Sequence, residues 1–238
     1  MVGHDPLAEL ARSPERAALL LDVDGTLAPI VPRPEDARVP DETRRELVRL
    51  AGRYALLACV SGRTGEDLER VVGVPELVYV GEHGLELAPE AERWVDRLRA
   101  FAEAMTEWPA ERKRLTLSYH WRTAPDEEAA IAVLERVAER ARAEQLVPRW
   151  GRKVLELRPP VGAHKGTAVV RLLGERGLER ALYAGDDATD LDAFRALDGL
   201  ELGVRVAVAS AEAPPGLREA ADLVVAGPGE LLELLQRL

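Results

Sequence analysis

An apolar run near the N-terminus stops abruptly at two aspartates, and this break constrains the fold more than any other feature. Residues 19–21 are all leucine, and the string Asp-Val-Asp-Gly-Thr follows directly at 22–26. Strand residues i and i+2 point to the same side, so Asp22 and Asp24 can face one spot where the strand ends. In open α/β sheets that carboxyl edge is where ligands bind. A carboxylate there can attack phosphorus or hold a hard cation; the simpler interpretation is a strand followed by an acidic turn.

Composition and charge exclude several classes of function. The chain has 238 residues, of which 47% are hydrophobic and 4% aromatic, so Leu, Val and Ala must build the core of one large domain or of a domain with an insertion. The formal net charge of −10 argues against nucleic acid as the main partner. No apolar run reaches the ~18 residues of a membrane helix, and the N-terminus lacks a secretion signal. We therefore expect no membrane association and a cytoplasmic enzyme. The single Cys59 cannot form an internal disulfide, and its apolar surroundings indicate a core residue.

Strand-like apolar runs alternate with helix-like stretches over most of the chain. Short strands alternating with helices predict an α/β fold with a doubly wound, Rossmann-like parallel sheet. The strands are predicted at residues 17–21, 55–60, 77–80, 181–184, 204–208 and 223–225, and the helices at 41–52, 66–72, 165–177 and 190–197.

The middle of the chain follows a different pattern. Residues 115–121 and 153–157 alternate between apolar and polar side chains, and helices are predicted at 91–107 and 126–145. Alternation is typical of strands with one solvated or cleft-lining face, so we expect a small α+β domain inserted in the parallel sheet. The predicted boundaries are 1–88 and 162–238 for the catalytic core and 89–161 for the insertion.

Polar residues that suit phosphoryl chemistry follow the predicted strands or begin a helix. A phosphoryl group needs a nucleophile, donors for its oxygens and cations that spread its charge. An aspartate is ionised at neutral pH (reference pKa ~3.9) and needs no base to attack, but it must approach a dianion, and Mg²⁺ between carboxylates removes that repulsion. Paired carboxylates without Cys or His clusters favour Mg²⁺ over zinc. The candidates are Asp22 and Asp24, Ser61 and Lys165 as phosphoryl donors, and Asp186, Asp187 and Asp190 after a later strand.

Each of these pieces alone has a simpler interpretation. Ser61 and the two residues after it could form an ordinary turn, and Lys165 could lie on a helix surface. The Gly-Asp-Asp string at 185–187 could be a turn with a helix cap, since Asp caps helices well. The order of all the pieces on successive strand ends is much harder to obtain by chance.

The strings at 22–27 and 185–187, with Ser61 and Lys165, resemble the haloacid dehalogenase (HAD) superfamily of phosphohydrolases. The resemblance implies a HAD-like core with a C2-type cap and an aspartyl-phosphate formed on Asp22. It implies that Asp24 is the general acid to the leaving alcohol and then the base for water. It also implies a Mg²⁺ site formed by Asp22, Asp186 and a backbone carbonyl at residue 23 or 24, supported by Asp187 or Asp190.

A longer set of strings resembles the trehalose-6-phosphate phosphatases: Gly-Glu-His-Gly-Leu-Glu at 81–86, Leu-Ser-Tyr-His-Trp-Arg at 117–122, Leu-Glu-Leu-Arg-Pro-Pro at 155–160, Lys-Gly-Thr-Ala at 165–168 and Gly-Asp-Asp-Ala-Thr-Asp at 185–190. His164 and Leu191 depart from that pattern. The resemblance implies a sugar-phosphate substrate whose hydroxyls pair with polar side chains of the cap. An ordinary solvated strand face could also carry His120 and Arg122, and His83 could be a core histidine. The implied substrate-binding residues are Gly62, Arg63, His83, Ser118, His120, Arg122, Glu156 and Arg158.

Three functions remain as hypotheses. The first is a Mg²⁺-dependent phosphatase of trehalose 6-phosphate, with functional coupling to a trehalose-phosphate synthase. The second has the same chemistry on sucrose, mannosylglycerate or glucosylglycerol phosphate, because only the cap can discriminate among sugars. The third is a non-catalytic sugar-phosphate sensor or a partner domain of a synthase, which the presence of every catalytic carboxylate disfavours.

Overall fold

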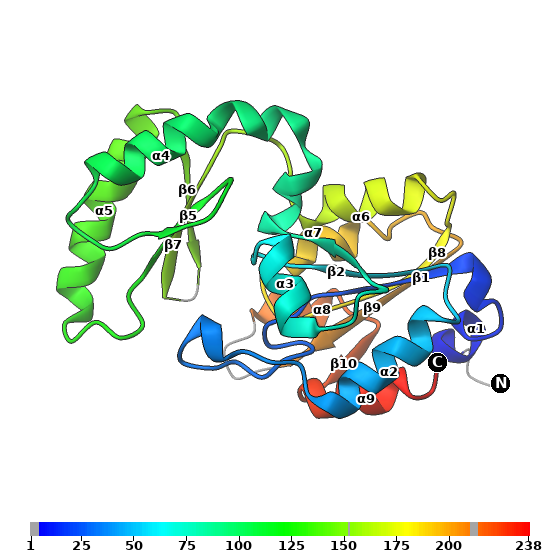
Figure 1. The fold of residues 1–238 in the computed structure, drawn as a ribbon. Coiled ribbons are helices and arrows are strands. Elements are labelled where there is room, and N and C mark those ends of the chain that lie inside the picture. Colours follow the sequence, from blue (N-terminus) through cyan, green and yellow to red (C-terminus); the bar gives the residue numbers. More distant parts are fainter. Residues whose placement is uncertain (1–4, 152, 210–213) are drawn as a thin grey trace. The chain divides into compact units, whose positions relative to one another are not determined.

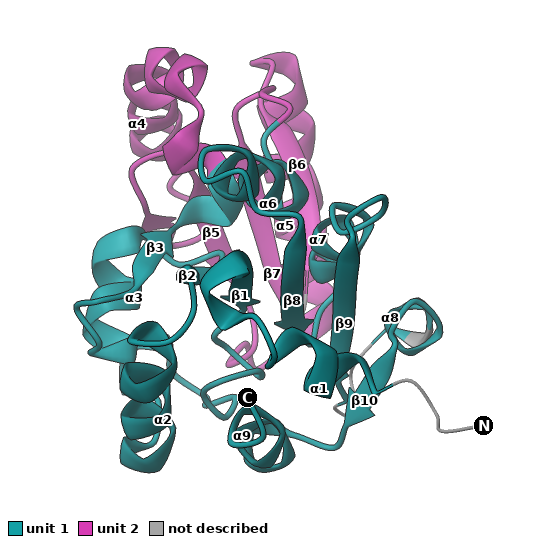
Figure 2. Cartoon of the chain, turned by 90° about the vertical axis from the view of Figure 1, so that its right-hand side faces the viewer, with its two compact units in different colours: residues 1–84, 163–238 teal, residues 85–162 magenta. Residues whose placement is uncertain are grey.

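The chain forms two compact units (Figure 2). The computed structural model describes residues 5–151, 153–209 and 214–238. Unit 1 comprises Met1–Gly84 and Ala163–Leu238, and unit 2 comprises Leu85–Gly162. The boundaries predicted from the sequence were 88/89 and 161/162.

Unit 1 is built on a six-stranded sheet in which every neighbouring pair of strands is parallel. Its order is β10-β9-β8-β1-β2-β3. The side chains of β1, β2 and β8 are buried throughout, as expected for parallel strands covered on both faces. The predicted doubly wound α/β core is therefore confirmed. The strands are β1 (Ala17–Leu21), β2 (Leu56–Val60), β3 (Val78–Val80), β8 (Arg180–Gly185), β9 (Leu202–Val208) and β10 (Leu223–Val225).

Helices cover both faces of this sheet (Figure 1). On one face, alternate strand residues such as Leu19, Leu21 and Cys59 share an apolar cluster with side chains of α1, α2, α3 and α9. On the other face, Tyr183 of β8 packs edge-on against Phe194 of α7, and α6 packs beside α7. The helices are α1 (Pro6–Leu10), α2 (Asp41–Ala51), α3 (Gly65–Val72), α6 (Lys165–Gly174), α7 (Asp190–Arg195), α8 (Pro215–Glu219) and α9 (Pro228–Leu235), with 3₁₀ segments at Pro14–Arg16, Pro34–Asp36 and Glu82–Leu87.

The strand order reverses between β1 and β8. β2 and β3 lie on one side of β1, and β8, β9 and β10 lie on the other. Ligands of open parallel sheets bind outside the carboxyl ends of the strands at such a switch point. Leu21 ends β1 and Gly185 ends β8, so the aspartates that follow these two residues lie where the fold favours a binding site.

Unit 2 combines a four-stranded antiparallel sheet, ordered β4-β5-β7-β6, with two helices. Leu117, Tyr119, Leu155 and Leu157 pack in one apolar cluster with α4 and α5, so the intervening side chains point to the opposite face. This is the alternation that the sequence predicts for an α+β insertion. The elements are α4 (Val95–Ala104), β4 (Glu111–Arg112), β5 (Leu117–His120), α5 (Glu127–Ala143), β6 (Val147–Gly151) and β7 (Val154–Arg158), with a 3₁₀ segment at Pro89–Trp94.

Several elements differ from the sequence-based prediction. The helix predicted at 91–107 is an α-helix only over Val95–Ala104. Strand β6 was not predicted and contains Pro148, which argues against a central strand. It lies at the edge of its sheet, where the missing N–H of proline is tolerated. Within the described ranges, no helix is long and apolar enough to cross a membrane.

Candidate active site

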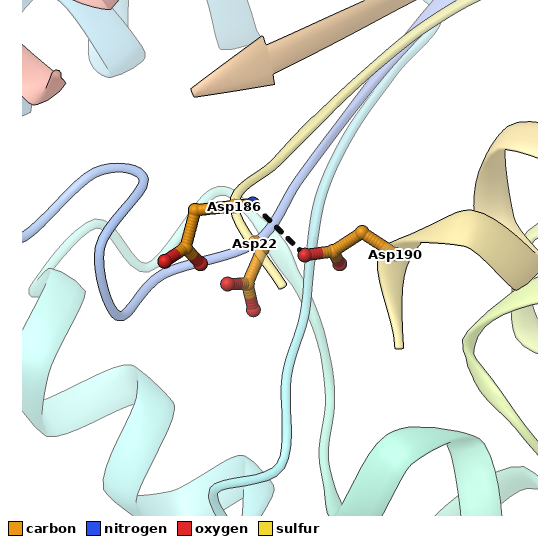
Figure 3. Close-up of side chains that lie close together, drawn as sticks. All are labelled: Asp22, Asp186 and Asp190. Carbon is orange, nitrogen blue, oxygen red and sulfur yellow. Dashed lines mark hydrogen bonds between the residues drawn. The ribbon is translucent and has the colours of Figure 1, made fainter. Parts of the chain in front are cut away.

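Three buried carboxylates meet at the carboxyl ends of β1 and β8 (Figure 3). Asp22 follows β1, Asp186 follows β8 and Asp190 begins α7. One oxygen from each lies within 4.8 Å of the others, and the residues are 4%, 1% and 0% exposed. The fold therefore brings together three aspartates that the sequence analysis assigned to one site.

Lys165, the first residue of α6, supplies the buried positive charge beside them. Its Nζ donates to Asp22 Oδ1 at 2.8 Å and to Asp190 Oδ1 at 2.7 Å. Burial alone would lower the pKa of Lys165, but the two carboxylates outweigh it and raise that pKa. Burial raises the pKa of Asp22 well above its usual range; Lys165 opposes this rise, whereas Asp190 and Asp186 add to it. Lys165 is thus the neighbour in this cluster that favours the ionised form of Asp22.

Asp190 holds the parts of the cluster in place. Its Oδ1 accepts hydrogen bonds from Lys165 Nζ and, at 2.8 Å, from the Tyr183 hydroxyl. Its Oδ2 accepts from the backbone N–H groups of Asp186 and Asp187, both at 2.9 Å. Two hydrogen bonds to each oxygen occupy the acceptor sites of a carboxylate. Asp190 therefore orients the lysine and the loop at 186–187.

Tyr183 is a site residue that the sequence analysis missed. Its side chain is fully buried in β8, and its hydroxyl donates to Asp190 Oδ1. A buried tyrosine hydroxyl usually finds a hydrogen-bond partner, so a tyrosine inside a predicted strand of the parallel sheet was the available signal. The sequence pattern alone did not identify which acceptor it would reach.

The turn after β1 requires a glycine. Gly25 has a φ of +83°, and a Cβ there would lie 2.2 Å from Asp186 Oδ2. The N–H groups of Leu27 and Ala28 donate to the carbonyl oxygen of Val23 at 2.9 and 2.8 Å. The tight turn therefore packs against the carboxylate of Asp186, which explains the glycine in the Asp-x-Asp-Gly-Thr string.

The donor set and the charge balance of the cluster fit a hard divalent cation. Asp22, Asp186 and Asp190 bring carboxylates to a site whose adjacent cation is Lys165. Buried charges that stay uncompensated are costly, and carboxylate oxygens are the ligands that hard divalent cations take. Because the oxygens of Asp190 already accept two hydrogen bonds each, Asp22 and Asp186 are the carboxylates that suit a metal. Asp187 lies next to them, half-buried, and its Oδ1 accepts from the N–H of Ala188 at 2.6 Å.

Asp24 is paired with Arg63. Nε and Nη2 of Arg63 donate to Asp24 Oδ2 and Oδ1 at 2.6 and 2.8 Å, and Nη1 donates to Asp67 Oδ2 at 2.5 Å. Burial would lower the pKa of Arg63, but its hydrogen bonds and charge contacts with Asp24 and Asp67 raise it. Arg63 was predicted from the sequence as a substrate-binding residue, whereas Asp67 was not predicted. The signal for Asp67 was an acid four residues after the arginine, in the first turn of a predicted helix.

Ser61, Gly62 and His83 lie close together after β2. Ser61 is buried, and its carbonyl oxygen accepts from the N–H of His83 at 2.8 Å. A Cβ on Gly62 would lie 2.5 Å from His83 Nε2, so the ring occupies space that only a glycine leaves. His83 has a φ of 56°, which places it in the left-handed region. These sequence-predicted residues therefore form one packed group.

Four predicted cap residues lie on the face of the unit 2 sheet that is opposite its helices: Ser118, His120, Glu156 and Arg158. Ser118 of β5 pairs with Glu156 of β7, and both are buried. His120 contacts Glu111 through Nε2 and Oε2 at 2.7 Å, and Arg158 Nε lies 3.8 Å from Glu156 Oε2. The face thus carries a compact set of charged and hydrogen-bonding groups.

Glu156 is the buried carboxyl of this face. Burial raises its pKa, although Lys113 and Arg158 oppose the rise. The sequence analysis missed Lys113 and Glu111 because neither stands in a string that it singled out. Arg122, which it did single out, lies in the turn beyond β5 and is exposed.

A family model described as trehalose-phosphatase matches residues 20–216. The chain belongs to the trehalose-phosphatase family. It is 31% identical over 272 residues to a trehalose 6-phosphate phosphatase of Zea mays, and the match covers 100% of this chain and 73% of the relative. Members of this family are phosphoric monoester hydrolases, which places the chain in that class of enzymes.

Two solved structures share the fold. The C-terminal domain of a trehalose-6-phosphate phosphatase from C. albicans matches with a TM-score of 0.74 at 25% identity, covering 97% of this chain and 93% of that chain. The C-terminal domain of a trehalose synthase regulatory protein from Candida albicans also matches, with a TM-score of 0.63 at 13% identity, covering 96% of each chain. That likeness concerns the fold alone. The fold alone does not distinguish a phosphatase from a regulatory domain. The function must therefore be inferred from the buried carboxylates and Lys165.

Proposed function

We propose that this protein hydrolyses trehalose 6-phosphate to trehalose and phosphate, with Mg²⁺, through an aspartyl-phosphate on Asp22. The observation that carries the proposal is the buried group of Asp22, Lys165, Asp186 and Asp190 at the switch point of the sheet, in a member of the trehalose-phosphatase family. A sensor would need to bind the sugar phosphate only, and it would have no need of a buried nucleophile with its own counter-charge.

The chemistry is a double displacement. An oxygen of Asp22 attacks phosphorus, and the P–O bond to the sugar breaks with its electron pair left on the sugar oxygen. Asp24 enters this step in its protonated form and gives that oxygen its proton. Asp24 then accepts a proton from the water that attacks phosphorus, which releases phosphate and restores the Asp22 carboxylate.

Phosphoryl oxygens need donors throughout these steps. An ammonium has three N–H donors, and two of those on Lys165 bond to Asp22 and Asp190, which leaves one for a phosphoryl oxygen. The buried Ser61 supplies a hydroxyl at the end of the neighbouring strand. The side chains that would hold Mg²⁺ are Asp22 and Asp186, with a backbone carbonyl from the turn at 23–24 and Asp187 beside them. When bound, the cation neutralises the phosphoryl charge that the nucleophile approaches.

The polar face of unit 2 is the part of the chain that suits sugar recognition. A disaccharide offers hydroxyl groups that both donate and accept, and Glu156, His120 and Arg158 supply both kinds of partner. A trehalose-phosphate synthase makes the proposed substrate, so functional coupling to such a synthase and a cytoplasmic location belong to the same proposal.

The test measures phosphate release from trehalose 6-phosphate, sucrose 6-phosphate and glucose 6-phosphate, each with Mg²⁺ and with EDTA. We expect release that requires Mg²⁺ and favours trehalose 6-phosphate by at least about tenfold, which corresponds to ~1.4 kcal/mol in the barrier. Similar rates on all three sugar phosphates would contradict the proposed specificity for trehalose 6-phosphate but would still support the proposed phosphatase chemistry of the core. No release from any of them would contradict both.

The nucleophile is tested by Asp22→Asn. The amide fills the same space but cannot form an aspartyl-phosphate, so we expect a loss of about 10⁴-fold or more in kcat, with a thermal midpoint within a few degrees of the parent. The matched control is Asp41→Asn, because the Asp41 side chain is 86% exposed at the start of α2, and it should keep full activity. Near-normal turnover of Asp22→Asn would contradict the mechanism.

A further inference from the structure

Arg63 forms a bidentate contact with Asp24, which is the general acid in the proposed function. Its Nε and Nη2 reach the two oxygens of Asp24 at 2.6 and 2.8 Å. Parallel contacts of this kind fix the plane and the direction of a carboxylate as well as adding attraction. The arginine side chain is 10% exposed and that of Asp24 is 34% exposed, so the contact is partly shielded from water.

The other donors of Arg63 anchor the arginine itself. Nη1 donates to Asp67 Oδ2 at 2.5 Å, and Nη2 also donates to the carbonyl oxygen of Pro34 at 3.1 Å. A guanidinium has five N–H groups, and these contacts with Asp24, Asp67 and Pro34 engage four of them. Arg70 holds Asp67 from the other side, with Nε at 2.9 Å from Oδ1. The guanidinium is therefore fixed from three directions and has little donor capacity left for a phosphate.

We infer that Arg63 is a positioning residue that holds the carboxylate of Asp24 for proton transfer to the leaving sugar oxygen, and that it does not bind the phosphoryl group. The inference rests on the proposed function, because it needs Asp24 to act as the acid. The physical reason is that Asp24 lies in a turn beyond the end of β1, where its side chain would otherwise sample several rotamers. Holding a catalytic group in its productive geometry contributes directly to rate.

Leaving-group dependence separates this role from phosphate binding and from a purely structural role. A sugar alkoxide is a poor leaving group and needs a proton, whereas nitrophenolate leaves without one. We therefore compare kcat/KM for trehalose 6-phosphate and for p-nitrophenyl phosphate in the full-length protein. The ratio kcat/KM reports the barrier between the free enzyme and substrate and the transition state of the first irreversible step. When cleavage of the P–O bond to the leaving group is that step, the later hydrolysis of the aspartyl-phosphate does not affect kcat/KM.

The decisive variant is Arg63→Met. We expect kcat/KM to fall about 100-fold on trehalose 6-phosphate, within the range that general acid catalysis contributes, and to change less than about threefold on p-nitrophenyl phosphate. Arg63→Lys should recover only part of the lost kcat/KM, since an ammonium group cannot make the bidentate contact with Asp24. In an Asp24→Asn background, Arg63→Met should add almost nothing, because residues that act as a unit are not additive.

The matched control is Arg49→Met, which removes an arginine that pairs with Glu46 on α2 of the same unit without touching the contacts of Arg63, and it should lose activity equally little on both substrates. Equal losses for Arg63→Met on both substrates, through a raised KM or through a lowered thermal midpoint, would overturn the inference. If Asp24→Asn shows the leaving-group dependence and Arg63→Met does not, the inference alone fails. If Asp24→Asn shows no such dependence either, the acid role in the proposed function has failed and the inference falls with it.

Discussion

The two units of the chain differ in how the charged side chains of their candidate sites are exposed to solvent. In unit 1, Asp22, Lys165, Asp186 and Asp190 are all buried and are joined by short hydrogen bonds around one lysine. In unit 2, the apolar side of the sheet packs on α4 and α5, and the polar side carries groups such as His120 that remain exposed. The charged groups of the unit 1 cluster are thus enclosed together, whereas the polar face of unit 2 combines the buried Glu156 with exposed groups such as His120.

The difference follows from the two kinds of sheet. Parallel strands end together at one edge, so β1 and β8 bring their aspartates into one enclosed place. Antiparallel strands alternate side chains over a whole face, so β5 and β7 spread their polar residues. Removing the charge of Lys165 in unit 1 should therefore affect folding and chemistry together, whereas changing the exposed His120 in unit 2 should alter substrate discrimination with little effect on stability.

Among the variants that compare the two units, Lys165→Met gives the largest expected effect, and it tests the first half of this contrast. Without the lysine, the buried carboxylates of Asp22 and Asp190 lose their cation, and breaking a buried ion pair by removing one partner typically costs 3–5 kcal/mol. We expect a loss of about that size in the free energy of unfolding, measured by urea titration, and a loss of at least about 10³-fold in phosphate release, of the order that loss of an electrostatic donor produces.

The control for this variant is Lys153→Met in unit 2. Lys153 pairs with Glu127 on the surface, and the two side chains are 40% and 52% exposed, so the change should cost less than ~1 kcal/mol. If Lys165→Met does not fold, Lys165→Arg keeps the charge and allows activity to be measured in a folded protein. Similar unfolding energies for the Lys165→Met and Lys153→Met variants would remove the contrast between the units.

His120→Ala tests the second half of the contrast. His120 contacts Glu111 in an exposed pair, so the free energy of unfolding should change by less than ~1 kcal/mol. Loss of one hydrogen bond to a sugar hydroxyl should lower kcat/KM on trehalose 6-phosphate by about tenfold, or ~1.4 kcal/mol, and leave p-nitrophenyl phosphate unaffected. The control is Arg136→Ala, an exposed change on α5 that should alter neither rate. An equal loss on both substrates would assign His120 to the chemistry.

The sequence predicted unit 1 well because its signals are local. Each strand is an apolar run that ends at a polar residue, and the strings at 22–26 and 185–190 carry their turn and their acids within a few residues. The topology of a parallel sheet then determines that those ends meet. Strand β6 escaped prediction because Pro148 masks the pattern, and only its edge position makes the proline acceptable.

Partners that are distant in sequence could not be predicted in the same way. Asp24 and Arg63 stand 39 residues apart, and no periodicity links a turn after one strand with a turn after the next. The resemblance implied that this arginine binds substrate, and no sequence signal linked it to Asp24. The roles of Tyr183 and Asp190 likewise depend on side-chain directions across β8 and α7 that spacing does not encode.

Glu156→Gln gives the smallest expected effect. It tests how the buried carboxyl group of unit 2 affects the stability of the protein. Glu156 is the one carboxyl among the predicted sugar-reading residues, and burial raises its pKa in the fold even though Lys113 and Arg158 oppose the rise. Between the ordinary glutamate pKa of ~4.3 and that raised value, the unfolded chain releases this proton and the folded chain keeps it. The free energy of unfolding therefore falls as pH rises through this window.

Glutamine cannot ionise, so the variant escapes that fall. At neutral pH Glu156→Gln should be more stable than the parent by about 1 kcal/mol, a typical gain when a destabilised site residue is replaced, and the difference should disappear below about pH 4, where the parent side chain is protonated in both states. Urea midpoints measured from about pH 3 to pH 8 test this. The control is Glu139→Gln on the exposed side of α5, which should differ from the parent by less than ~0.5 kcal/mol at each pH. A stability gain that stays constant with pH would mean that ionisation of Glu156 is not what lowers the free energy of unfolding of the parent. A gain that grows with pH, together with slower hydrolysis of trehalose 6-phosphate, would show that unit 2 gives up stability to keep a buried carboxylate where a sugar hydroxyl can reach it.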